Sequence, residues 1–138
     1  MGVNIYCGKQ PSMDMSYSTF DRWRVQLAYA LSEDFGDNYS HWLFCLNRTK
    51  QEQELAIKSL ERACNNTPEL TDELFEFFMM SDCEGKINSE TSKQLIPLIE
   101  KLDEDYEIGY LGLYPYNKKY VVNFFKHSVR YHANVYWS

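Results

Sequence analysis

The sequence predicts a mainly α fold: a compact bundle of about five helices, with a small two-stranded sheet that pairs the N- and C-terminal segments. Three observations predict it. Apolar residues recur at helical spacing through most of the chain, capping signals precede these stretches, and short alternating stretches occur at both ends. With 138 residues the chain is expected to form one globular domain over residues 1–138 with a buried core.

The first predicted element is a strand over residues 2–8, where apolar and polar residues alternate between two glycines. A single strand needs a partner. Residues 133–137 alternate in the same way, with Val135 and Trp137 on one side. We therefore expect the two ends of the chain to pair. Residues 9–17, with Pro11 and several short polar residues, are expected to form a loop.

A first helix is predicted to begin at Ser18, where Asp21 three residues later completes a capping signal. It is expected to end near Phe35, with Gly36 as its stop. The apolar stripe of this helix consists of Phe20, Trp23, Leu27, Ala30 and Leu31.

Several polar residues in and after this helix allow two interpretations. Arg22 and Arg24 fall off the stripe and are interpreted as solvated, with contact to an anion or an acidic partner as the alternative. The aromatic residues 37–47 fit a short buried helix or a strand. Within them His41 stands beside Trp42, but no nucleophile and orienting carboxylate lie near it in the sequence, so we interpret it as structural.

Two further helices are predicted before residue 81. Thr49 and Glu52 form a capping box for the first. Thr67, followed by Pro68, predicts the start of the second. The apolar residues of the second helix are Leu70, Leu74, Phe75, Phe77, Phe78, Met79 and Met80. This broad set predicts burial on more than one side, or alternatively a Met/Phe patch for a partner.

The last two helices are predicted after residue 88. The first has Pro97 inside it, which predicts a kink or a late start, and it is expected to end near Leu102. A loop rich in Gly, Tyr and Pro follows over residues 109–117, and the final helix is expected over residues 117–131. His127 and His132 are five residues apart, which disfavours a metal pair on one helix face.

An acidic loop lies at the centre of the chain. Its residues Asp82, Glu84, Gly85 and Ile87 resemble the middle of the loop of EF-hand calcium proteins, in which carboxylates alternate around a glycine. The resemblance implies Asp82 and Glu84 as calcium ligands.

The loop departs from the EF-hand pattern at its two ends. Met80 and Thr91 occupy the places of the first ligand and of the bidentate glutamate. The alternative, which we favour, is a turn in which Gly85 takes a positive φ and Asn88 or Ser89 caps the next helix. The run from Ser81 to Gly85 also resembles a family of small bacterial and phage proteins with a Ser-Asp-Cys-Asp/Glu-Gly loop, which implies a bacterial or phage setting and no particular activity.

Charge is unevenly distributed along the chain, whose net charge is −6. Residues 66–108 carry 12 acidic and 3 basic side chains, whereas residues 109–138 carry 4 basic and no acidic ones. The overall sign disfavours nucleic acid as a partner. The cysteines Cys7, Cys45, Cys64 and Cys83 are far apart in the sequence and match no zinc or disulfide pattern. We expect free thiols in a cytoplasmic protein without a membrane segment.

Phosphate loops, dinucleotide fingerprints and the usual catalytic motifs are absent from the sequence. The acidic block and the abundance of aromatic residues favour a non-enzymatic protein-binding or regulatory module, of phage or prophage origin, with the acids of Asp103–Asp105 as a partner contact. One alternative is a divergent calcium-binding helix–loop–helix centred on Asp82 and Glu84. The other is a small enzyme that uses His41, His127 or His132 with cysteine or carboxylate partners.

Overall fold

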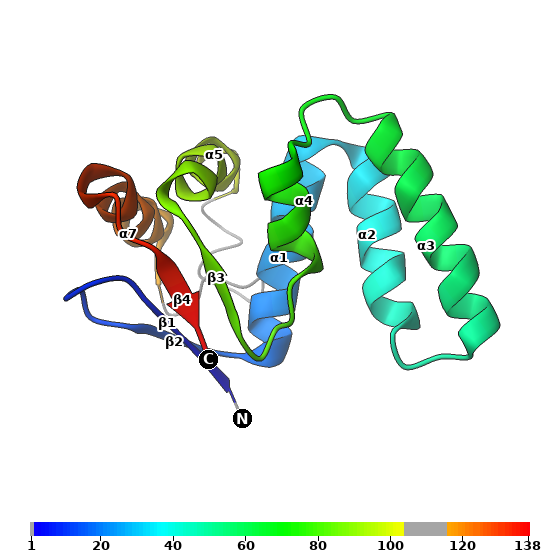
Figure 1. The fold of residues 1–138 in the computed structure, drawn as a ribbon, viewed down its shortest axis with the longest axis horizontal. Coiled ribbons are helices and arrows are strands. Elements are labelled where there is room, and N and C mark those ends of the chain that lie inside the picture. The colour runs from blue at the N-terminus through cyan, green and yellow to red at the C-terminus, as the bar shows by residue number, and fades with distance from the viewer. Residues whose placement is uncertain (1, 104–115) are drawn as a thin grey trace.

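The computed structural model describes residues 2–103 and 116–138, which form six helices and one four-stranded antiparallel sheet (Figure 1). The elements in chain order are β1 (Gly2–Tyr6), β2 (Met13–Ser16), α1 (Tyr17–Leu31), α2 (Glu33–Cys45), α3 (Lys50–Asn65), α4 (Asp72–Met79), β3 (Gly85–Ile87), α5 (Ser89–Glu100), α7 (Lys118–Tyr131) and β4 (Val135–Trp137). None of the described helices is both long and apolar enough to cross a membrane. Residues 109–115 of the predicted loop and residues 104–105 of the Asp103–Asp105 run lie outside the described residues.

The predicted pairing of the two chain ends is confirmed. The strand order is β2-β1-β4-β3, and β1 pairs with β4 through Ile5 with Trp137 and Tyr6 with Tyr136. Beyond these pairs, the Asn4 N–H donates to the carbonyl oxygen of Ser138 at 2.9 Å. The expectation of only two strands is wrong, because β2 and β3, both expected as loops, pair along the two sides of this central pair.

The sheet has one buried and one exposed face. Inward-facing residues alternate with outward-facing ones on every strand, as the pleat requires. The buried side chains are those of Val3, Ile5, Met13, Met15, Ile87, Val135 and Trp137. Helices α5 and α7 lie side by side over the sheet, while α2 and α3 form a hairpin at the far end of the molecule (Figure 1).

An aromatic cluster joins the helices to the buried face of the sheet. The Phe20 ring lies 5.5 Å from Trp137, and the Trp23 ring lies 6.3 Å from Phe77 and 5.8 Å from Phe125, measured between ring centroids. These rings come from α1, α4, α7 and β4. Tilted and edge-on pairs at such spacings are favourable beyond the area that they bury. Part of the aromatic content of the sequence therefore serves the core.

The predicted stop of the first helix at Gly36 is wrong. Helix α1 ends at Leu31, and Ser32 both closes it and caps α2, its hydroxyl oxygen accepting the Phe35 N–H at 3.0 Å. Gly36 lies inside α2. A Cβ at Gly36 would meet the Tyr29 ring at 2.3 Å, so this glycine is required by the close packing of α1 against α2.

Of the other predicted caps, Thr49 and Asn88 are confirmed, and Thr67 and Ser18 are wrong. The side chains of Thr49, Asn88 and Asn117 cap α3, α5 and α7. The predicted start at Thr67 is wrong, because α4 is capped by Thr71. The Thr67 hydroxyl donates instead to the Ala63 carbonyl oxygen at 2.8 Å, and so closes the end of α3. Likewise α1 is capped by Ser16 rather than Ser18.

Gly85 does not take the positive φ that a turn would require. It is the first residue of β3, and among the described residues only Gly8 and His132 have a positive φ. A Cβ at Gly85 would lie 2.1 Å from the Trp137 ring. The indole therefore packs directly on the glycine backbone, and the requirement for glycine here is steric.

We expect Gly85→Ala to lower the free energy of unfolding by about 1–3 kcal/mol, the usual cost of overpacking. The indole of Trp137 and the β3 backbone must separate to admit the methyl group. Urea denaturation measures the change. The matched control is Glu84→Ala at the exposed neighbouring position, which is expected to be close to neutral. Equal stability of the two variants would contradict the packing argument.

Candidate functional site

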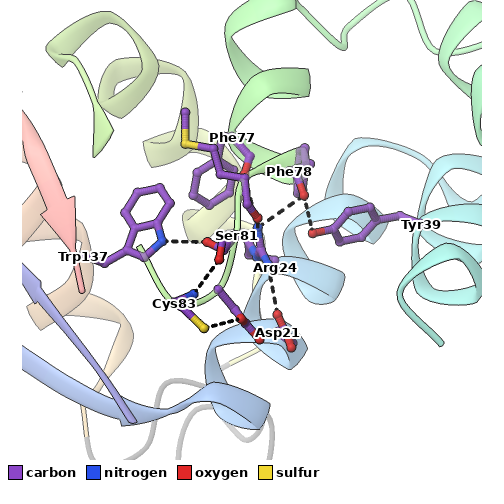
Figure 2. Close-up of polar contacts among 10 residues, drawn as sticks. Asp21, Arg24, Tyr39, Phe77, Phe78, Ser81, Cys83 and Trp137 are labelled. Carbon is purple, nitrogen blue, oxygen red and sulfur yellow. Dashed lines mark hydrogen bonds and ion pairs between the residues drawn. The ribbon is translucent and has the colours of Figure 1, made fainter. Parts of the chain in front are cut away.

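The polar centre of the molecule is Arg24 on α1, which is only 2% exposed. Its Nη1 donates to three backbone carbonyl oxygens, those of Phe77 at 3.3 Å, Phe78 at 3.2 Å and Met80 at 2.7 Å (Figure 2). These carbonyls lie at the C-terminal end of α4, where helical N–H partners are missing and the helix dipole is negative. The guanidinium therefore caps α4, and the interpretation of Arg24 as solvated is wrong.

Other side chains hold the guanidinium in place. Nη2 donates to Asp21 Oδ1 at 2.9 Å, one helical turn earlier on α1. The Arg24 Cζ lies 4.9 Å from the centroid of the Phe20 ring. The Tyr39 hydroxyl donates to the Phe78 carbonyl oxygen at 2.7 Å, and burial raises the pKa of Tyr39, which keeps this donor protonated. Helices α1, α2 and α4 thus meet at one hydrogen-bonded centre.

Asp21 faces a second carboxyl group, that of Asp82 on the connection between α4 and β3. Burial raises the pKa of Asp21 most, the hydrogen bond from Arg24 lowers it, and the Asp82 carboxyl raises it again. The net shift is upward from the ordinary value of 3.8. Two carboxyl groups from distant parts of the sequence therefore share one side of the arginine.

The predicted calcium ligands Asp82 and Glu84 are placed differently by the structure. Asp82 lines a cleft together with Asp21, whereas Glu84 is exposed and does not line it. Two carbonyl oxygens of the loop are already hydrogen-bonded, that of Met80 to Arg24 and that of Ser81 to Trp137 Nε1 at 2.9 Å. Over the described ranges no three His, Cys, Asp or Glu side chains are grouped to hold a metal ion. Calcium binding stays a prediction.

Asp21 lies where two clefts adjoin, and Asp82 lines one of them; we call the two clefts together the α1–α2 groove. One cleft, of about 380 Å³, lies between α1, the end of α2 and the end of α4, and the other, of about 460 Å³, lies between α1 and α2. Asp21 and Leu43 line both. The main apolar lining residues are Trp42, Leu43, Phe44, Leu46, Met79 and Met80.

The outer rim of the α1–α2 groove is apolar and open to solvent. The Phe44 side chain is 63% exposed and that of Leu46 is 47% exposed. Both lie at the C-terminal end of α2. Large exposed apolar side chains beside a cleft are candidates for an interaction site. The sequence had indicated a Met/Phe patch as one interpretation of residues 70–80, and Met79 and Met80 are half-buried in this lining.

The three histidines lie in different environments. His41 Nε2 is 3.5 Å from Cys45 Sγ, but Cys45 is buried and out of reach of a substrate. His127 packs against the Tyr131 ring, and His132 ends α7 in the left-handed conformation. Within residues 2–103 and 116–138 none of the three is hydrogen-bonded to a carboxylate. The histidine-based enzyme stays a hypothesis without an assembled site, and the four cysteines are free, as predicted.

Comparisons of the chain with family models, with curated proteins and with solved structures found no match.

We expect Arg24→Lys to lower the free energy of unfolding by at least about 2 kcal/mol. Lysine keeps the charge, but a point ammonium cannot reach the α4 carbonyls and Asp21 together, and buried polar groups then lose their partners. Urea denaturation measures the loss. The matched control is Arg62→Lys, because Arg62 pairs with Asp34 at the surface, and its stability should equal that of the wild type. A fully stable Arg24→Lys variant would contradict the capping role.

We expect Asp82→Asn to stabilise the protein at pH 7 by roughly 0.5 kcal/mol, the cost of a close like-charge pair. Because the pKa of Asp21 is raised in the folded state, wild-type stability falls as pH rises through that pKa. Removing the Asp82 charge removes one cause of the shift. The gain should vanish in acid, below the ordinary pKa of 3.8 for Asp21, where the Asp21 carboxyl is protonated and the repulsion between two carboxylates is lost. Urea denaturation midpoints of the wild type and of Asp82→Asn, measured from pH 7 down to below 3.8, test this prediction. A stability gain that persists in acid would contradict the pairing of the two carboxyl groups.

Proposed function

We propose that the chain is a non-enzymatic protein-binding module whose α1–α2 groove receives an amphipathic helix of a partner protein. The observation that carries the proposal is the exposed apolar rim formed by Phe44 and Leu46, which continues into the lining of the two clefts. Helix-in-groove recognition uses apolar anchors spaced about one turn apart. Methionine and aromatic side chains suit such a surface because they repack around different anchors.

The charge of the groove specifies the partner further. Asp21 and Asp82 place two carboxyl groups in the cleft at the end of α4, and the Arg24 Nη donors beside them are directed to α4 and Asp21. A lysine or arginine next to the apolar anchors of the partner helix would complement these carboxyls. The resemblance of the Ser81–Gly85 run supports a bacterial or phage protein as that partner's source.

Selection of peptides from a displayed library of random 16-residue sequences tests the proposal on the immobilised protein. We expect the selected peptides to carry apolar residues at positions i, i+3 or i+4, and i+7, with a lysine or arginine beside them. Phe44→Asp should weaken their binding at least about tenfold, because a carboxylate would replace an apolar contact with the peptide. Fluorescence anisotropy of the labelled peptides measures the dissociation constants.

The matched control is Leu55→Asp on α3. The Leu55 side chain is 66% exposed, as accessible as Phe44, but it lines neither cleft of the groove. Its peptide affinities should equal those of the wild type. Peptides that bind the Phe44→Asp variant as tightly as the wild type, or that lose binding on Leu55→Asp, would contradict the assignment of the groove.

A further inference from the structure

A separate cleft, of about 290 Å³, lies on the exposed side of α7 and shares no lining residue with the α1–α2 groove. Its lining residues are Gln10, Asn123, Lys126, His127, Arg130 and Tyr131. Each of these side chains carries at least one N–H or O–H donor, and none is a carboxylate. In a chain with a net charge of −6, a cleft lined only by donors and cations is a distinct chemical environment.

Helix geometry explains why these side chains converge. Residues 123, 126, 127, 130 and 131 recur at the three- and four-residue spacing that places side chains on one face of α7. Gln10 reaches this face from the β1–β2 connection, and its Nε2 donates to the Phe124 carbonyl oxygen at 3.2 Å. That hydrogen bond holds the connection against the helix and closes one side of the cleft.

Ring contacts order the C-terminal end of the cleft. The His127 ring lies 4.6 Å from the Tyr131 ring, and the Arg130 Cζ lies 5.3 Å from the Tyr131 ring centroid. An arginine stacked on an aromatic ring loses less side-chain freedom when it binds a ligand. The guanidinium is thus positioned before any ligand arrives.

Ordinary helix stability does not account for both cations. Lys126 and Arg130 are four residues apart, a spacing at which like charges destabilise a helix. In the described part of the chain neither forms an ion pair with a carboxylate. Arg130 lies in the last turn of α7, where a positive charge interacts favourably with the helix dipole, but Lys126 lies beyond the range of that interaction. A bound anion would compensate the repulsion between them.

We propose that this cleft binds a phosphate group. Arg130 offers the planar fork that matches two phosphate oxygens, Lys126 supplies a second charge, and His127, Asn123 and Tyr131 supply further donors. A polynucleotide fits less well, because its affinity depends on many phosphate contacts, and the cleft has two permanent cations in an acidic chain. The ligand is therefore a single phosphate group, free or carried by a small molecule.

Titration of the isotopically labelled protein with inorganic phosphate, followed by amide and side-chain NMR shifts at constant ionic strength, tests the proposal. We expect saturable shifts at Gln10 and along residues 123–131. Arg130→Gln or Lys126→Gln should each weaken binding about tenfold, because each removes a charged hydrogen-bond donor. The matched control is Lys93→Gln, which removes one exposed positive charge from α5 and should leave the affinity unchanged.

Two further probes identify the source of the phosphate. Glycerol 3-phosphate that binds more tightly than inorganic phosphate assigns the site to a phosphate ester, and equal affinities assign it to the free ion.

Shifts that do not saturate, or equal affinities for the wild type and both cleft variants, would overturn the proposal. Saturable binding of a 12-nucleotide single-stranded DNA without saturable phosphate binding would overturn it in favour of a polyanion surface. All four proteins should show the same thermal unfolding, since the changed residues are exposed.

Discussion

The hydrogen bonds from Arg24 to the last carbonyl oxygens of α4 determine how α1 and α4 pack against each other. They connect α1 to a helix more than fifty residues away, and they fix where the chain leaves α4 toward β3. From that point the Ser81 carbonyl oxygen accepts a hydrogen bond from Trp137 Nε1, so the sheet is joined to the same centre. Burying a guanidinium is costly unless its donors are paired, and here helix carbonyls and one carboxylate pair those of Nη1 and Nη2, whereas Nε has no hydrogen-bond partner among the described residues.

The same arrangement produces the chemistry of the surface. Because Arg24 needs a counterion, Asp21 lies beside it, and because the chain turns back at Ser81, Asp82 comes to lie beside Asp21. The apolar ends of α2 and α4 then enclose these carboxyls within the α1–α2 groove. The basic cleft of α7 lies on another helix, at the other end of the molecule from the α2–α3 hairpin (Figure 1). The carboxyl groups of Asp21 and Asp82 and the cations Lys126 and Arg130 thus line separate clefts.

Local signals in the sequence predicted part of the local structure. The caps Thr49 and Asn88 and the pairing of the chain ends depend on neighbouring residues or on strand alternation, both visible in the sequence. The predictions of Gly36 as a helix stop and of Gly85 as a turn glycine are wrong because each glycine packs against a ring from another element, Tyr29 or Trp137. No local pattern carries that information.

The candidate site was only partly visible in the sequence. The acidic loop pointed to Asp82, but its partner Asp21 comes from α1, and Glu84 takes no part in the cleft. Arg24 was assigned to solvent because it falls off the apolar stripe, although it satisfies carbonyls at the end of another helix. The one available signal was Asp21 three residues before it, a spacing that pairs side chains on a helix.

NMR of the arginine side chains tests the central role of Arg24 most directly. If its guanidinium caps α4, the Nη protons of Arg24 should give separate, slowly exchanging signals, with couplings across the hydrogen bonds to the carbonyl carbons of α4. Those of Arg62, which is exposed, should be averaged by rotation and exchange. A single averaged Nη signal for Arg24, like that of Arg62, would contradict the account.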